Sequence, residues 1–269
     1  MSPRSRRFLS GATLLLSLGA CDKLTNVSAG GTPVMLVTLG ARSKTTGFSM
    51  SPVSNFYRVG SATFSSALAA TDSCRSIGYD PGTPPPPVLA ASIGGGAYVA
   101  VRVPGRTDTL RKVSTTDLTY RLASLAGMDF TPGDSITFVV AGDVTGFPAV
   151  TLTGRTAEAF TLSPVVVPGS PGSPMALKWS APADPNAAML VSLRYNNGTG
   201  AGLNAQILCD FRDRGEGTVP AALTVLWSGS NTREIFTERL RTALVRVPGA
   251  TDSYFNMIST FDIPTPVSP

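Results

Sequence analysis

Short runs of apolar and polar residues recur along most of the chain. Alternation is clearest in Tyr98-Val-Ala-Val-Arg-Val103 and in Leu190-Val-Ser-Leu-Arg-Tyr195, and it is typical of strands that bury one face. Runs of this kind, bounded by Gly, Pro, Asn, Asp or Ser, predict strands over residues 34–39, 97–103, 118–122, 136–140, 159–167, 176–179, 189–195, 205–211, 223–227, 243–247 and 254–258. Only residues 64–70 and 233–244 could hold a helical turn or two. The pattern therefore predicts an all-β fold.

One linker divides this all-β chain into two parts. The 27 glycines and 22 prolines between short strands are typical of sandwiches or barrels. Residues 167–174, with the sequence VPGSPGSP, have no core-forming residue after the first position, which indicates a linker. We therefore expect two tandem β-sandwich, immunoglobulin-like domains, over residues 33–166 and 175–269. Residues 81–87 (PGTPPPP) indicate an extended surface loop of the first domain.

Two stretches of the second part resemble known proteins. The segment Met175-Ala-Leu-Lys-Trp-Ser-Ala-Pro182 resembles the second strand of a fibronectin type III domain, where a buried tryptophan follows an alternating apolar pattern. This resemblance implies an immunoglobulin/fibronectin III-like domain over residues 175–269. The region from Ile207 to Pro220 is similar to a stretch of uncharacterised lipoproteins of high-GC bacteria, a family that offers no activity to carry over.

An internal repeat bears on the domain count. Residues 101–108 and 245–252 agree at seven of eight positions (VRVPGRTD and VRVPGATD). Duplicated domains would explain this agreement, but the two copies lie at very different distances from the ends of their expected domains. We favour two separately arising segments, each a strand followed by a turn.

The N-terminus has the order of a secretory signal. Arg4, Arg6 and Arg7 precede an apolar stretch over residues 8–18, which is about half the length that a membrane-spanning helix needs. The tetrapeptide Leu18-Gly-Ala-Cys21 resembles the lipobox of bacterial lipoproteins. The resemblance implies that residues 1–20 are a cleaved signal peptide. It also implies that residues 21–32 form a tether carrying diacylglycerol, usually with a third acyl chain, on Cys21.

Three features of this export signal stay open. An ordinary signal peptide with a chance cysteine at position 21 is the alternative to a lipoprotein signal. Residues 5–9 (SRRFL) also look somewhat like a twin-arginine signal. Asp22 after the cysteine tends to retain enterobacterial lipoproteins in the inner membrane, but this rule does not hold across phyla. We therefore expect a lipid-anchored protein of the cell envelope, in the inner or the outer membrane.

The charge and the cysteine content limit which binding partners and which disulfide bonds are expected. The formal net charge of +5 falls to about +2 once the three signal arginines are removed, and no Lys/Arg cluster remains. Nucleic acid and anionic lipid surfaces are thus unfavourable targets. With Cys21 lipidated, Cys74 and Cys209 remain, and an oxidising envelope permits them to form a disulfide across the two expected domains. The alternative is two separate buried thiols.

The absence of histidine restricts the possible catalytic and metal-binding chemistry more than any other feature of the sequence. It excludes Ser-His-Asp and Cys-His catalysis in their usual form, and two free cysteines alone cannot hold zinc. Gly133-Asp-Ser-Ile136 resembles the motif of GDSL-type hydrolases, but those enzymes need a histidine, so Ser135 is interpreted as the residue that follows a turn.

Other polar and aromatic residues also fit structural roles. Asp210, Asp213 and Glu216 surround Gly215 without EF-hand spacing and with arginines between them, which favours a solvated turn over a calcium site. Trp179 and Trp227 stand among apolar neighbours and are expected to be buried rather than to bind sugars. We therefore predict no catalytic residue, no metal site and no cofactor.

These observations favour a non-catalytic lipoprotein that serves an interaction or a structural role with an unknown envelope protein as partner. The alternative, from another class, is a carbohydrate-binding protein or a glycan-acting enzyme that uses Asp and Glu alone. A cleft lined by two carboxylates and exposed aromatic rings would favour this alternative.

Overall fold

The architecture is that of a computed structural model, which describes residues 31–59, 70–79, 91–114, 117–170, 172–184, 187–199, 202–250 and 253–265. The signal peptide, Cys21, the tether up to residue 30, the expected helical turn over 64–69 and the 81–87 loop lie outside these residues. The elements, in chain order, are β1 (Thr32–Ser43), β2 (Phe48–Val59), β3 (Ser73–Gly78), β4 (Ala91–Ser92), β5 (Tyr98–Val103), β6 (Arg106–Lys112), β7 (Tyr120–Leu122), β8 (Met128–Phe130), β9 (Ser135–Val140), β10 (Val150–Arg155), β11 (Met175–Lys178), β12 (Ala188–Tyr195), β13 (Ala205–Arg212), β14 (Glu216–Val219), α2 (Ala221–Ser228), β15 (Arg233–Arg246) and β16 (Tyr254–Thr265).

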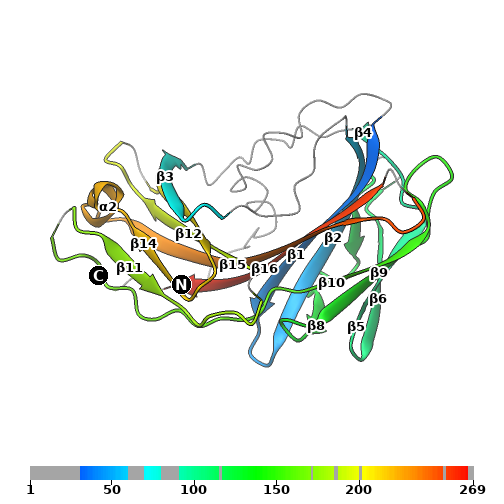
Figure 1. Ribbon diagram of the computed structural model, residues 1–269, viewed down its shortest axis with the longest axis horizontal. Coiled ribbons are helices and arrows are strands. Elements are labelled where there is room, and N and C mark those ends of the chain that lie inside the picture. The colour runs from blue at the N-terminus through cyan, green and yellow to red at the C-terminus, as the bar shows by residue number, and fades with distance from the viewer. Residues whose placement is uncertain are drawn as a thin grey trace, which may run out of the picture.

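The prediction of an all-β fold is confirmed. One 14-stranded sheet has the order β10-β9-β5-β6-β7-β2-β1-β16-β15-β12-β13-β3, with β4 and β8 also paired to β2. A separate two-stranded sheet contains β11 and β14. Figure 1 shows the large sheet as a long curved band, with β11, β14 and α2 at one end and β5, β6 and β9 at the other. No helix in the described ranges is long and apolar enough to cross a membrane.

The strands of the large sheet fall into two blocks that follow the chain. Those before the expected linker at 167–174 lie from β10 to β1, and those after it lie from β16 to β13. The blocks meet where β1 and β16 pair in parallel, whereas the other described strand pairs are antiparallel. The exception is β3, which comes from the first half of the chain but pairs with β13. The division into two tandem immunoglobulin-like sandwiches is therefore not confirmed, because one continuous sheet contains both blocks.

The main core forms where this sheet turns back over itself. The ring of Phe138 on β9 lies 5.7 Å from that of Phe255 on β16, measured between centroids. A Cβ atom at Gly154 on β10 would lie 2.5 Å from the Met257 methyl group, so glycine permits the close approach of β10 to β16. This sandwich-like closure explains the alternation in β1, where Met35 and every second residue after it as far as Ala41 are buried.

At the other end of the band, the small sheet, α2 and the segment before β11 cover the same face. Trp179 and Trp227 are both buried in this core, as predicted. A smaller apolar cluster lies on the opposite face, and its members are Ala70, Ala188, Leu190, Leu240 and Ile258. The strands between the two clusters are therefore buried on both faces, which is why β12 shows almost no polar alternation.

Three local predictions were wrong. Residues 223–227 belong to the helix α2 rather than to a strand, and residues 233–244 belong to the strand β15 rather than to a helix. Residues 159–167 contain no strand but only a bridge between Leu162 and Trp179.

Each copy of the internal repeat contains a hairpin turn. Gly105 lies between β5 and β6 with φ +74°, and Gly249 lies between β15 and β16 with φ +75°. This left-handed backbone conformation favours glycine, so the shared sequence corresponds to a shared turn.

Candidate functional site

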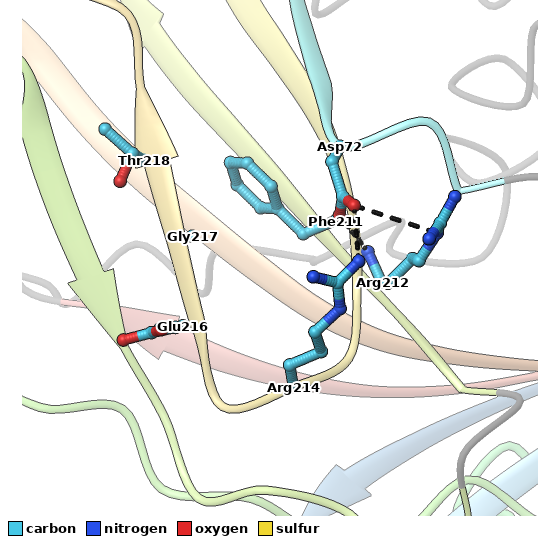
Figure 2. A pocket seen from close by; sticks show the side chains of 7 residues that line it. All are labelled: Asp72, Phe211, Arg212, Arg214, Glu216, Gly217 and Thr218. Atoms are coloured by element: carbon cyan, nitrogen blue, oxygen red, sulfur yellow. Dashed lines mark hydrogen bonds and ion pairs between the residues drawn. The ribbon is translucent and has the colours of Figure 1, made fainter.

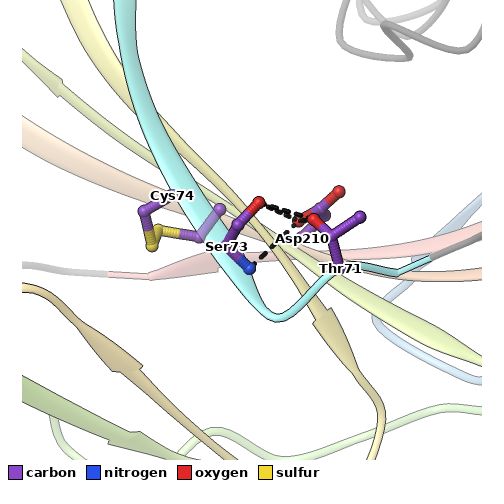
Figure 3. Close-up of a disulfide and its surroundings, with 5 residues drawn as sticks. Thr71, Ser73, Cys74 and Asp210 are labelled. Atoms are coloured by element: carbon purple, nitrogen blue, oxygen red, sulfur yellow. Dashed lines mark hydrogen bonds between the residues drawn. A yellow bond between two sulfur atoms is a disulfide. The ribbon is translucent and has the colours of Figure 1, made fainter.

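A disulfide joins the two halves of the chain at one edge of the large sheet. Cys74 on β3 lies directly opposite Cys209 on β13 in the antiparallel register, and their sulfur atoms are bonded across 135 residues of sequence (Figure 3). Cys209 is buried, whereas β3 is mostly exposed and ends the sheet. The bond thus fixes a short polar edge strand to a buried apolar neighbour.

A polar cluster beside the disulfide supports the start of β3. One carboxylate oxygen of Asp210 accepts hydrogen bonds from the Thr71 hydroxyl at 2.8 Å and from the Ser73 hydroxyl at 3.2 Å (Figure 3). The Ser73 backbone N–H also donates to it at 3.4 Å. Asp210 therefore serves as an anchor for the chain entering the edge strand.

A shallow pocket of about 310 Å³ adjoins this edge. Its lining residues are Asp72, Phe211, Arg212, Arg214, Glu216, Gly217 and Thr218. Figure 2 shows the side chains of Arg212 and Arg214 on either side of the Asp72 carboxylate. Arg214 donates to it at 2.8 Å, and the Arg212 backbone N–H donates at the same distance. These hydrogen bonds hold Asp72 at φ +52°, a conformation that is otherwise confined to glycine among the described residues.

The pocket contains charge but no reactive group. Its lining contains two guanidinium groups and two carboxylates, so its formal charge is balanced. The Phe211 ring is buried and cannot serve as an exposed platform for a sugar. The arrangement can bind polar groups by hydrogen bonds, but it offers no nucleophile with a neighbouring base.

The three acids that sequence reasoning considered for calcium have three different roles. Asp210 binds Thr71 and Ser73, Glu216 lines the pocket, and Asp213 lies in a buried ion pair. Within the described ranges, no group of three or more potential metal ligands comes together. The interpretation of these residues as a solvated turn is wrong for Asp213, whose side chain has no exposed surface.

The buried ion pair between Asp213 and Arg239 attaches the segments before and after β11 to the sheet. The Arg239 Nε atom donates to Asp213 at 2.6 Å, and Trp179 Nε1 donates to the other carboxylate oxygen at 2.6 Å. The remaining guanidinium nitrogens of Arg239 donate to the backbone carbonyl groups of Ala159 and Ser180. Both charges of this network are paired inside the core, so the network holds these segments against the sheet.

A second buried pair consists of two carboxyl groups, which sequence reasoning missed. Glu238 on β15 lies directly opposite Asp262 on β16, and Glu238 is only 2% exposed. Burial raises the pKa of Glu238 well above its usual value, and the neighbouring Asp262 raises it further. Burial also raises the pKa of Asp262, against hydrogen bonds from Glu238 and Thr260.

This carboxyl pair has the chemistry of two groups that share a proton. Within the described part of the chain, no N–H or hydroxyl group donates to the buried oxygens Glu238 Oε1 and Asp262 Oδ1. A proton held between the two groups supplies the missing donor and removes one buried charge. No signal in the sequence could have joined residues 24 positions apart, because only the strand register brings them together.

The remaining predicted residues lie apart from these sites. Ser135 is exposed at the start of β9, directly after the expected turn in which the Asp134 N–H donates to the Thr131 carbonyl group at 3.1 Å. Cys21 lies outside the described residues.

Comparisons with known proteins give little to set beside this geometry. No protein-family model matches the chain, and no curated protein matches it. Among solved structures, the chain is similar to a DUF4785 family protein from Legionella pneumophila subsp. pneumophila str. Philadelphia 1, with a TM-score of 0.26 and 11% sequence identity. The similarity covers 76% of this chain and 51% of that protein, so the chain spans about half the length of that protein. A similarity this low carries no argument about function.

Proposed function

We propose that this protein is a membrane-anchored lipoprotein of the cell envelope with a non-catalytic interaction or structural role. The observation that carries the proposal is the disulfide between Cys74 and Cys209. Disulfides persist in oxidising compartments outside the cytoplasm. The chain has three cysteines, so this bond leaves Cys21 as the one unpaired cysteine. A leftover cysteine in an exported protein needs an explanation, and lipidation within the lipobox-like tetrapeptide supplies one.

The lipid anchor can be tested by metabolic labelling with palmitate. We expect Cys21→Ala to abolish the label and to leave an uncleaved precursor, because the modified sulfur is also part of the cleavage site. The matched control is Cys74→Ala, which removes another cysteine and should keep the label. Labelling that persists in Cys21→Ala would contradict the proposal.

The non-catalytic role is supported by how the polar groups of the described residues are used. The chain has no histidine, and the buried charges of Asp213 and Arg239 are bound to one another. At the pocket, Asp72 is similarly bound to Arg212 and Arg214. These groups stabilise the fold and leave no activated nucleophile among the described side chains.

An interaction role has a suitable surface at the edge strand β3. Within the described part of the chain, β3 pairs on one side only, with β13, and its side chains at Ser73, Arg75 and Ser76 are exposed. Such an edge can add a strand from a partner through backbone hydrogen bonds. The disulfide holds β3 in place, so a partner that binds β3 does not have to offset the entropy cost of ordering this strand.

Photo-cross-linking in intact envelopes tests this surface. A photoreactive residue at Ser76 should capture one dominant, stoichiometric envelope protein after affinity purification. The same residue at Arg102 is the control, because Arg102 is exposed on β5 and its backbone is paired on both sides, with β6 and with β9. Capture of glycan, or equal capture at both positions, would contradict the edge as the binding surface.

The alternative function is a carbohydrate-binding protein or a glycan-acting enzyme that depends on Asp and Glu. The Glu238–Asp262 pair does not favour it, because Glu238 is only 2% exposed and a general acid has to reach its substrate. A glycan array and an assay for released reducing ends test it. Bound glycan or released reducing ends would support the alternative, and the absence of both would contradict it.

The division of the chain also remains a proposal. We propose an N-terminal unit over residues 33–166 and a C-terminal immunoglobulin/fibronectin III-like unit over residues 175–269. The two contiguous strand blocks support this division, whereas the β1–β16 pair and the position of β3 couple the units. Separate unfolding transitions after cleavage in 167–174, under reducing conditions, are the expected result.

A further inference from the structure

The end of the sheet at which β1 begins is the place where the proposed tether joins the fold. Gly31 directly precedes β1, and its carbonyl group accepts a hydrogen bond from Arg58 Nη1 at 3.4 Å. The other terminal nitrogen of Arg58 donates to the Thr145 carbonyl group at 3.1 Å. The tether junction therefore adjoins the β9–β10 loop. The ten peptide units that separate Cys21 from Gly31 span at most about 35 Å, so the acyl chains hold this end of the fold close to a bilayer.

Exposed apolar side chains gather at the same end. Val144, next to Thr145, is fully exposed, and Tyr98, Val113 and Val245 are each about half exposed. These four are half of the large hydrophobic side chains that the described part of the chain exposes. An isolated exposed hydrophobic residue needs no explanation, but a group of them at one end of a molecule indicates an interaction surface.

Backbone pairing places these four side chains at the tether junction. The Ala141 N–H donates to the Tyr98 carbonyl group at 3.3 Å, which joins the start of β5 to the β9–β10 loop. Val245 lies opposite Phe255, and Phe255 lies opposite Met35, three residues into β1. Near Val113, the next strand begins at Tyr120, whose hydroxyl group donates to the Gly96 carbonyl group at 2.7 Å. Figure 1 shows this end beside β4, which pairs with the last residues of β2.

The loop that carries Val144 is held in a fixed shape. The Phe147 N–H donates to the Gly94 carbonyl group at 2.8 Å, and the Gly142 N–H donates to the Gly95 carbonyl group at 3.1 Å. Inside the loop, Asp143 accepts from the Thr145 backbone and hydroxyl groups. The hydrogen-bonded turn thus holds the Val144 side chain in solvent, where it does not pack against the rest of the fold.

Cations outnumber acids at this end. The cations are Arg58, Arg111, Lys112, Arg121 and Arg246, and the acids are Asp117 and Asp143, so the surface suits a leaflet that contains anionic head groups. A tyrosine among small apolar side chains is typical of shallow contact with the interfacial zone of a bilayer. We propose that the end formed by Tyr98, Val113, Val144 and Val245 contacts the leaflet that holds the acyl chains. This inference rests on the proposed lipid anchor and adds the orientation of the protein on the membrane.

Fluorescence quenching by brominated lipids tests the proposed contact. A Val144→Cys variant of the full lipidated protein would carry an environment-sensitive dye and be reconstituted in phosphatidylethanolamine–phosphatidylglycerol vesicles. The native cysteines do not compete for the dye, because Cys21 is acylated and the other two are bonded to one another. The matched controls are Leu125→Cys, which is almost fully exposed and lies near Arg42 at the far end of β1, and Leu226→Cys on α2.

We expect brominated lipids to lower the emission of the dye at position 144 about twofold, because shallow insertion brings it within reach of the acyl chains. The emission at positions 125 and 226 should change little. Equal quenching at the three positions, or no quenching at position 144, would overturn the proposed orientation while the lipid anchor stands. A mature protein that carries no acyl chain by mass spectrometry would overturn the anchor and with it this inference.

Discussion

Removal of the Asp213 carboxylate provides the sharpest test of how this fold is held together. In the native protein, the side chains of Asp213 and Arg239 are 0% and 2% exposed, and Trp179 donates to the same carboxylate. Asp213→Ala leaves the Arg239 guanidinium buried, with only the backbone carbonyl groups of Ala159 and Ser180 as acceptors. The substitution also leaves the Trp179 N–H without a partner.

The magnitude of the loss follows from these contacts. Leaving one member of a buried ion pair uncompensated costs about 3–5 kcal/mol, and a buried N–H without an acceptor costs about 1–3 kcal/mol. Both groups bind one carboxylate, so the two costs are not additive. We expect Asp213→Ala to lower the free energy of unfolding by about 4 kcal/mol, a large part of the 5–15 kcal/mol typical of a folded protein.

Urea unfolding followed by tryptophan fluorescence measures this loss, because Trp179 lies in the network itself. The matched control is Glu234→Ala, which breaks a partly exposed pair with Arg194 and should cost at most about 1 kcal/mol. The double variant Asp213→Leu/Arg239→Met removes both charges and should regain at least about 2 kcal/mol relative to Asp213→Ala. A loss below about 1 kcal/mol in Asp213→Ala, or no recovery in the double variant, would refute the reasoning.

Two further predictions concern the carboxyl pair and the disulfide. In the folded state, burial raises the pKa of Glu238, so the folded protein holds a proton that the unfolded chain releases above its ordinary pKa, near 4.5. Stability therefore falls as pH rises through this range, by about 1.4 kcal/mol per unit of pKa shift, and Glu238→Gln should flatten the fall of the urea midpoint between pH 4 and 8. An unchanged slope would show that Glu238 does not hold the proton. For the disulfide, the pair Cys74→Ser/Cys209→Ser should lower the free energy of unfolding by about 2–5 kcal/mol, and thermal denaturation with and without reductant should show no further reductant effect in that variant.

The sequence predicted the strands best where local pattern and tertiary environment agree. The expected strands at 189–195 and 205–211 lie within β12 and β13, and the expected turn before Ser135 is present. In these places, the apolar spacing and the turn residues are set by near neighbours. The same local reasoning correctly predicted that Trp179 and Trp227 are buried.

Local reasoning failed where distant parts of the chain decide the outcome. A five-residue apolar run such as 223–227 fits a strand or a helix equally well, and Pro220 as the N-cap of α2 was not recognised as a start signal. Residues 233–244, which could have held a helical turn or two, form β15 because β12 and β16 pair with this strand on both sides. The Glu238–Asp262 pair and the parallel β1–β16 contact depend on register across the sheet, which no local pattern encodes.

The position of β3 connects the structural and the interaction roles of the disulfide. Without β3, the edge of the sheet would be β13, a longer strand whose apolar residues are buried and whose backbone would then be open to pairing with other chains. Because β3 is short, polar and bonded to β13, it prevents unspecific pairing of other chains with β13. The exposed edge of the sheet is then β3, which can pair more selectively. If closure is the main role of the bond, its loss should lead to aggregation of the protein on its own. If the bond mainly presents β3 to a partner, its loss should reduce cross-linking from Ser76 while the protein stays monomeric. The two roles therefore separate in one variant, by light scattering of the purified protein and by capture in the envelope.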